Sequence, residues 1–333
     1  MVSGLPNARA RSLLARRAAT LRSVFCCGAG PAHYARGSDI GRVLTGLRHS
    51  GGGRRRLLLA GKRLRRDVDA ARNDKLDGAE KLAQKAGNKI ASYFPGWTVS
   101  AEGLWGSPAQ ILLDTAEWWH PDLIVVGSHG RSPVARLFLG SVSLELVHKA
   151  SCSVRVARAC GAPTRSGPIR IIIGSDGSTE AEAVVATVAA RSWPEKTEAE
   201  IISAVQTLVP ATTTALEANT FMQEPAYTVI CEIDERERNR LHAVCEAGAD
   251  VLRRAGLTTT CSVLDGDPRD IILAGSDLAS TDAIFLGARG LGRVERLLLG
   301  SVSSHIISHA HSTVEVVRNT KVNGADPGGA LAE

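Results

Sequence analysis

The sequence predicts an α/β protein of two tandem domains, each with an open parallel sheet of five strands, the first domain being N-terminally incomplete. Two observations lead to this fold class. A glycine-containing segment at residues 127–143 returns at residues 287–303, and the match continues upstream at the same spacing. Short apolar runs also alternate with helical patterns through the second copy, which is typical of parallel sheets with right-handed crossovers.

Length and composition limit the number of domains and the class of protein. The 333 residues leave room for two domains of ordinary size, and 44% hydrophobic with 22% charged residues is typical of a globular protein. No apolar run approaches the roughly 18 to 20 residues needed to cross a bilayer. No membrane partner is therefore expected, and the cytoplasm is the expected location. The seven cysteines show no CxxC pair or metal spacing, so they are interpreted as reduced structural thiols.

Residues 1–66 differ from the rest. They hold fifteen Lys or Arg and a single acid, Asp39, whereas the remaining sequence holds 25 bases and 33 acids. Neither helical nor strand periodicity is evident, and this segment is predicted to be a basic, disordered arm. Binding of nucleic acid or of a membrane surface, a targeting presequence, and an out-of-frame stretch replacing half a domain are alternative interpretations.

The second copy, residues 168–318, can be assigned element by element. Ser178 is a candidate N-cap for the first helix, and Gly256 is suited to the end of the second. The Asp267-Pro268 pair opens the third helix. Strands are predicted at 169–175, 200–205, 257–264, 283–286 and 313–317, and helices at 178 to about 194, 229–255, from 268, and 301–309.

The first copy, residues 67–158, is expected to be a partial domain, and residues 319–333 a flexible tail. Its glycine segment is intact. The position matching Asp176, which lies 160 residues earlier, is Arg16, and no strand followed by Asp-Gly-Ser exists there. The first copy is therefore predicted to bind a ligand weakly or not at all.

Ligands of open parallel sheets bind beyond the carboxyl ends of the strands, where the strand order reverses. The fourth strand of the second copy is followed there by the pattern Gly287-x2-Gly290-x9-Gly300-Ser301. These glycines allow close backbone approach, and the last residues open a helix whose N–H groups and dipole favour a phosphate. Hydroxyl groups of Ser301, Ser303 and Ser304 are additional candidate donors.

The Asp-Gly-Ser turn after the first strand, together with this glycine pattern, resembles the ATP-binding branch of the universal stress proteins. The resemblance covers roughly residues 67–158 and 168–318. It implies two Rossmann-like domains, related to adenine nucleotide alpha hydrolases, and ATP as ligand, with Mg²⁺. Asp176 would contact the adenosine part, and the strand end at Val205 would line the adenine pocket.

The resemblance assigns the remaining contacts to the loop and the helix after it. The ribose and phosphates would be held by Gly287, Gly290, Gly300, Ser301, Val302 and Ser303. Arg289 and Arg293 in the loop are candidates to add positive charge at the phosphates, with solvated, exposed side chains as the alternative. Weaker counterparts in the first copy are Gly127, Gly130, Gly140, Ser141 and Val142. The two copies are expected to form an intramolecular pseudo-dimer, with a homodimer as the alternative.

Enzymatic sites are not evident. No Walker motif occurs, and no nucleophile–base set or acid pair is marked out by spacing, so at most slow ATP hydrolysis is expected. His305 and His309 have i, i+4 spacing on the last helix but no accompanying carboxylate motif, and no metal site is predicted. A binding module is therefore favoured over an efficient enzyme, and the resemblance implies nucleotide binding in a stress response. A nucleotide-free scaffold of the same fold is the alternative.

Overall fold

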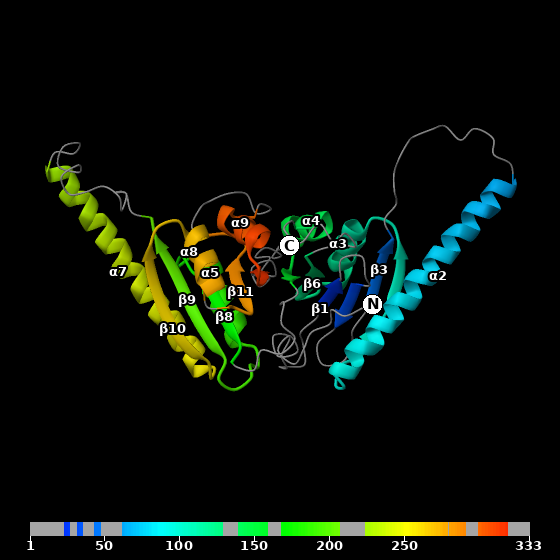
Figure 1. The fold of residues 1–333 in the computed structure, drawn as a ribbon, viewed down its shortest axis with the longest axis horizontal. Coiled ribbons are helices and arrows are strands. Elements are labelled where there is room, and N and C mark those ends of the chain that lie inside the picture. The colour runs from blue at the N-terminus through cyan, green and yellow to red at the C-terminus, as the bar shows by residue number, and fades with distance from the viewer. Residues whose placement is uncertain are drawn as a thin grey trace, which may run out of the picture. The chain divides into compact units, whose positions relative to one another are not determined.

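The protein consists of two compact units, one holding residues 158–318 and the other residues 18–157 (Figure 1). The computed structural model describes residues 23–26, 32–35, 43–47, 62–128, 139–158, 168–206, 224–278, 280–290 and 299–318. Within these ranges, each helix is too short or too polar to be a membrane span.

The second copy forms a five-stranded parallel sheet, as predicted. Its strands are β8 (Arg170–Gly174), β9 (Glu198–Val205), β10 (Thr258–Asp265), β11 (Ala283–Gly287) and β12 (Thr313–Val317). They lie in the order β10-β9-β8-β11-β12, and every neighbouring pair is parallel. The strand order therefore reverses between β8 and β11, which makes the gap between their ends the topological switch point.

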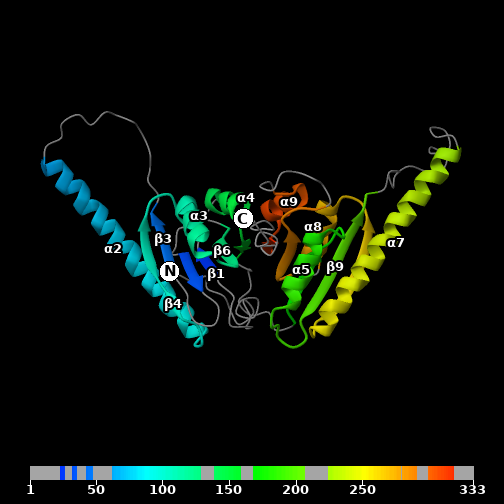
Figure 2. The same ribbon diagram turned by 180° about the vertical axis from the view of Figure 1, so that it is seen from behind.

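Helices cover both faces of this sheet. They are α5 (Thr179–Ala189), α7 (Glu224–Arg254), α8 (Pro268–Leu278) and α9 (Ser301–His309). The pair α5 and α7 contact each other on one face, and the pair α8 and α9 contact each other on the other. In Figures 1 and 2, α7 lies along β10 and continues past the end of that strand.

The alternation of side chains along β8 explains why helices cover both faces of the sheet. Ile171 and Ile173 are buried in one cluster with Val184 of α5 and Cys245 of α7. The intervening Ile172 points the other way, where a Cβ added at Gly275 of α8 would lie 3.8 Å from its Cδ1. Successive residues of a strand face opposite sides, so a continuous isoleucine run requires cover on both faces.

The first copy forms a second sheet, with seven strands. These are β1 (Ser23–Cys26), β2 (Ala32–Ala35), β3 (Val43–Leu47), β4 (Val99–Ser100), β5 (Glu102–Trp105), β6 (Leu123–Gly127) and β7 (Ser153–Ala157). Their order is β7-β6-β1-β2-β3-β5, with β4 beside β2. Its helices are α2 (Lys62–Tyr93), α3 (Pro108–Trp119) and α4 (Ser141–Lys149).

The prediction of five strands is wrong for this first sheet. Three stretches of residues 1–66, expected to lack strands, form β1, β2 and β3. Strand β1 pairs in parallel with β6, and β3 pairs in parallel with β5, while β2 is antiparallel to both β1 and β3. The sequences of β1, β2 and β3 are SVFC, AHYA and VLTGL, and none has a continuous aliphatic run such as the three isoleucines of β8. Pairing with distant strands determines their structure.

A backbone detail repeats between the copies. Residue His120, which directly follows α3, has φ 50°, and Ser280, just after α8, has φ 51°. Non-glycine residues seldom adopt this left-handed conformation. Its recurrence at equivalent positions supports the tandem duplication.

Candidate functional site

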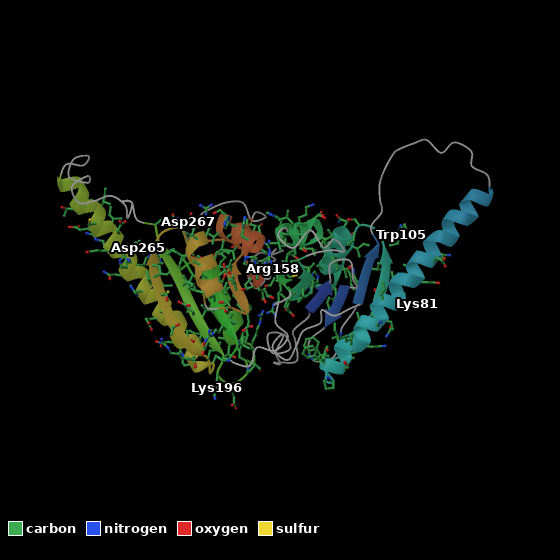
Figure 3. All side chains as sticks on the ribbon, viewed as in Figure 1. Lys81, Trp105, Arg158, Lys196, Asp265 and Asp267 are labelled. Carbon is green, nitrogen blue, oxygen red and sulfur yellow. The ribbon has the colours of Figure 1, made fainter. Side chains whose placement is uncertain are left out.

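The candidate site lies at the carboxyl ends of the strands of the second sheet. Figure 3 shows Asp265 and Asp267 at this end and Lys196 at the opposite end. The segments that leave β8 and β11 here are residues 175–178 and 288–290. The neighbouring strands β8 and β11 belong to opposite halves of the sheet, so these two segments border the switch point.

The turn after β8 is held by its own side chains. The carboxylate of Asp176 accepts a hydrogen bond from the backbone N–H of Ser178 through Oδ1, at 3.0 Å. The hydroxyl of Ser178 in turn accepts from the N–H of Ala181, at 3.2 Å, and caps α5. Gly177, between Asp176 and Ser178, has φ +77°, where a side chain would be strained. This turn fixes the direction of the Asp176 carboxylate.

The glycine segment after β11 packs directly against that carboxylate. A Cβ added at Gly290 would lie 2.2 Å from Oδ2 of Asp176, so no other residue fits there without movement. A Cβ added at Gly287 would lie 2.9 Å from the carbonyl oxygen of Arg289 and 3.1 Å from Cβ of Glu180. Both glycines therefore permit close approach of chain segments, whereas the predicted close approach of a ligand to this loop stays a prediction.

The start of α9 is attached to the end of β11 by two hydrogen bonds. The N–H of Gly300 donates to the carbonyl of Ala288 at 2.8 Å, and the hydroxyl of Ser303 donates to the carbonyl of Gly287 at 2.6 Å. The first bond within the helix runs from Ser304 N–H to the Gly300 carbonyl. The N–H groups before it have no acceptor within the helix, which is the arrangement that suits an anion.

The structure places most of the predicted site residues along this one edge. Ser303 is buried, and its hydroxyl holds Gly287. Val205 ends β9, with its side chain buried and its carbonyl accepting from Gly266 N–H at 3.0 Å. The other residues at the ends of β8 and β11 and the start of α9 are Asp176, Gly287, Arg289, Gly290, Gly300, Ser301 and Val302. Residues Arg293 and Gly130 lie outside the described residues.

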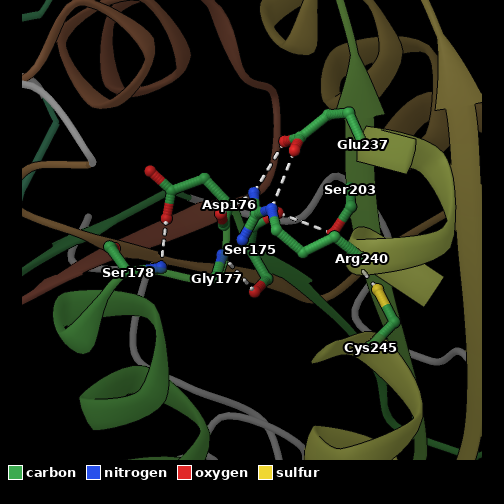
Figure 4. A network of polar contacts seen from close by, with 8 residues as sticks. All are labelled: Ser175, Asp176, Gly177, Ser178, Ser203, Glu237, Arg240 and Cys245. Atoms are coloured by element: carbon green, nitrogen blue, oxygen red, sulfur yellow. Dashed lines mark hydrogen bonds and ion pairs between the residues drawn. The ribbon is translucent and has the colours of Figure 1, made fainter. Parts of the chain in front are cut away.

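Sequence reasoning missed a support for the Asp176 turn. Arg240 of α7 donates through Nη2 to the backbone carbonyl of Asp176, at 3.1 Å, and its Nε and Nη2 bind both carboxylate oxygens of Glu237 (Figure 4). The hydroxyl of Ser203 on β9 donates to the carbonyl of Ser175 at 2.7 Å. Arg240 follows Asp176 by 64 residues, and no local pattern in the sequence connects them.

Charge pairing shifts the pKa values of these side chains. The hydrogen bond from Arg240 lowers the pKa of Glu237, and the bond to Glu237 raises the pKa of Arg240. At the end of β10, Arg238 binds Asp265 at 2.7 Å. The hydrogen bonds from the Arg269 side chain and backbone lower the pKa of Asp267 to about 2.

The first copy retains the base of the loop. The hydroxyl of Ser143 donates to the carbonyl of Gly127 at 2.7 Å, and Gly140 N–H donates to the carbonyl of Ser128 at 2.8 Å. Ser141 and Val142 begin α4. These two hydrogen bonds lie at the same positions of the repeat as those from Ser303 to Gly287 and from Gly300 to Ala288 in the second copy. The hydrogen bonds at the base of the loop therefore belong to the repeat and do not depend on the Asp-Gly-Ser turn.

The histidines of α9 stack on each other. The rings of His305 and His309 have centroids 4.1 Å apart, and Nδ1 of His309 lies 2.8 Å from the carbonyl oxygen of His305. Over the residues described above, no group of three or more His, Cys, Asp or Glu side chains is placed to hold a metal ion.

Comparison with known proteins agrees with the fold and the motifs. The profile of the Universal stress protein family matches twice, at residues 57–158 and 169–318. The chain therefore belongs to the universal stress protein family and carries two copies of its domain.

Individual relatives of the chain are also universal stress proteins by name. The universal stress protein Rv2005c of Mycobacterium tuberculosis is 25% identical over 226 residues, which is 67% of this chain and 70% of that protein. A putative universal stress protein of Staphylococcus haemolyticus, SH1215, is 31% identical over 158 residues, covering 46% of this chain and 86% of that protein.

The chain is also similar to solved structures. A universal stress protein from Archaeoglobus fulgidus is 20% identical, with a TM-score of 0.48, and the match covers 76% of this chain and 82% of that one. A putative universal stress protein from Pseudomonas aeruginosa is 14% identical, with a TM-score of 0.49, covering 86% and 94%.

Proposed function

We propose that the second copy binds an adenine nucleotide, ATP with Mg²⁺, and acts as a nucleotide-binding module in a stress response. The observation that carries this proposal is the contact between the two motifs. Gly290 of the loop after β11 lies against the carboxylate of Asp176 after β8, at the switch point of the sheet. Motifs that lie 114 residues apart in the sequence thus meet where such sheets bind ligands.

The local chemistry suits the parts of a nucleotide. The Asp176 carboxylate is an acceptor for hydroxyl groups of a ribose. The N–H groups of Ser301 and Val302 lie at the positive end of the α9 dipole, and Gly300 leaves that end without a side chain, so a phosphate can approach closely. Arg289 adds a positive charge next to the loop. The pseudo-dimer of the two copies, and a role for the nucleotide in changing partner contacts, stay predictions within this proposal.

Titration calorimetry of MgATP into the full chain tests the proposal. We expect the unmodified chain to bind, and Asp176→Ala and Gly290→Ala to lose binding, the first by removing the acceptor and the second by forcing a methyl group into the carboxylate. Gly78→Ala is the matched control, because a Cβ at this exposed helical position meets nothing within 4 Å. Its binding should equal that of the unmodified chain.

Two outcomes would contradict the proposal. If the unmodified chain gives no heat and no competition with a fluorescent ATP analogue, the nucleotide-free scaffold becomes the better interpretation. If Asp176→Ala binds as tightly as the unmodified chain while remaining folded, nucleotide binds elsewhere.

A further inference from the structure

The side chain of Arg240 occupies the space behind the Asp176 turn. Its Nη1 lies 2.7 Å from the position of a Cβ at Gly177, and Val244 of the same helix lies 3.3 Å from it. Figure 4 shows Arg240 on one side of the backbone of residues 175–177 and the Asp176 carboxylate on the other. Arg240 thus contacts the main chain of the turn and leaves the carboxylate facing the glycine loop.

The guanidinium is itself held in place. Its Nε lies 2.8 Å from Oε2 of Glu237 and its Nη2 lies 2.6 Å from Oε1. This two-point contact orients the plane of the guanidinium, and lysine cannot reproduce it. One further N–H of Nη2 reaches the Asp176 carbonyl. The result is a continuous connection from α7 to the turn.

The two copies differ at this position. The buried residues of the two long helices have the same spacing of four, four and three residues: Ala79, Ala83, Gly87 and Ile90 in α2, and Leu241, Cys245, Ala249 and Leu252 in α7. In this register, the residue of α2 that corresponds to Arg240 is Gly78. The copy without an Asp-Gly-Ser turn therefore also lacks the arginine that would support it.

We infer that Arg240, oriented by Glu237, is a positioning residue that sets the Asp176 carboxylate for nucleotide binding. The inference rests on the proposed function of the second copy. The arginine contacts the backbone of the turn and acts on the ligand only through Asp176. Its influence should therefore extend to the part of the nucleotide that Asp176 contacts and should not reach the phosphates bound at α9.

The test compares three probes on the full chain: MgATP, adenosine, and Mg-tripolyphosphate. Arg240→Gln removes the charged guanidinium that donates to the Asp176 carbonyl. We expect this variant to bind MgATP and adenosine about tenfold more weakly and to bind tripolyphosphate with unchanged affinity. Arg240→Lys should recover only part of the loss. Arg236→Gln is the matched control, since Arg236 forms an exposed i, i+4 pair with Glu232 on the same helix.

Several outcomes separate this inference from its alternatives. Equal weakening of all three probes would indicate a general structural defect and overturn it, as would unchanged adenosine binding in Arg240→Gln. If the unmodified chain binds no nucleotide, the proposed function fails, and hydrogen exchange then decides about Arg240. Faster exchange of the Ser178 and Ala181 amides in Arg240→Gln than in Arg236→Gln would support the positioning role, and equal exchange would refute it.

Discussion

At the scale of single residues, the second copy places arginines beside carboxylates along the edge where the ligand is proposed to bind. Arg238 with Asp265, Arg240 with Glu237, and Arg269 with Asp267 form pairs of this kind. Only the Arg240 pair also contacts the main chain of the Asp176 turn. The pairs are partly exposed, so solvent screening limits what each contributes to stability.

The pair of Asp267 and Arg269 predicts a pH dependence. The folded pKa of Asp267 is about 2, below its ordinary value of 3.8. A lowered folded pKa gives stability that is present above pH 3.8 and is lost as the pH falls towards 2. The effect should be small, since 29% of the Asp267 side chain and 45% of the Arg269 side chain are exposed.

Urea unfolding between pH 2 and 6 measures this contribution. Asp267→Asn keeps an acceptor for the Arg269 backbone N–H but removes the charge. We expect the unmodified chain to exceed the variant in free energy of unfolding above about pH 4, and the difference to vanish near pH 2. A difference that stays constant over this range would show that the charge of Asp267 does not contribute.

At the scale of helices and strands, the end of α3 carries a strained residue. His120 has φ 50° and ψ 60°, and its N–H donates to the Ala116 carbonyl at 3.0 Å. Its side chain is exposed. Because glycine adopts this conformation without a steric penalty, His120→Gly is expected to raise the free energy of unfolding by about 1 kcal/mol.

Thermal and urea unfolding test this expectation, with His120→Ala as the control. Alanine keeps a Cβ in the left-handed region and should not stabilise the chain. Equal stability of the glycine and alanine variants would mean that the helix end relaxes away from this conformation.

The elements also show what the sequence could and could not predict. Each predicted helix and strand of the second copy is present, and the last strand, 313–317, has the predicted ends. These elements have clear local signals: isoleucine runs, the Ser178 cap, and the turn at Asp267-Pro268. The strands β1, β2 and β3 have none, because long-range pairing determines them. Arg240 was missed for the same reason, since its contact joins distant parts of the chain.

At the scale of the whole molecule, the unequal copies predict one nucleotide per chain. Gly300→Val should abolish binding, and Gly140→Val, the same change in the first copy, should leave both affinity and stoichiometry unchanged. The comparison is well matched, because both glycines have φ near −65°, a backbone conformation open to all residues, and both precede a nine-residue helix. A Cβ at Gly140 would lie 3.2 Å from the Ser128 carbonyl oxygen, and one at Gly300 would lie 3.4 Å from that of Ala288.

Calorimetry on the full chain gives the stoichiometry directly. A value near two, falling to one in either variant, would show that the first copy also binds and that the Asp-Gly-Ser turn is not required. Loss of binding in Gly140→Val would instead indicate that the sites depend on each other.

The hydrogen bonds at the base of each glycine loop have one more consequence. Gly300 is bound to Ala288, and Ser303 to Gly287, so the ends of the intervening segment are held together by the fold itself. For a segment with fixed ends, the entropy of closure grows only with the logarithm of its length, about 0.6 kcal/mol for each doubling. Insertions between Gly290 and Gly300 should therefore cost the fold little stability, whereas Gly290 itself is fixed by its contact with the Asp176 carboxylate.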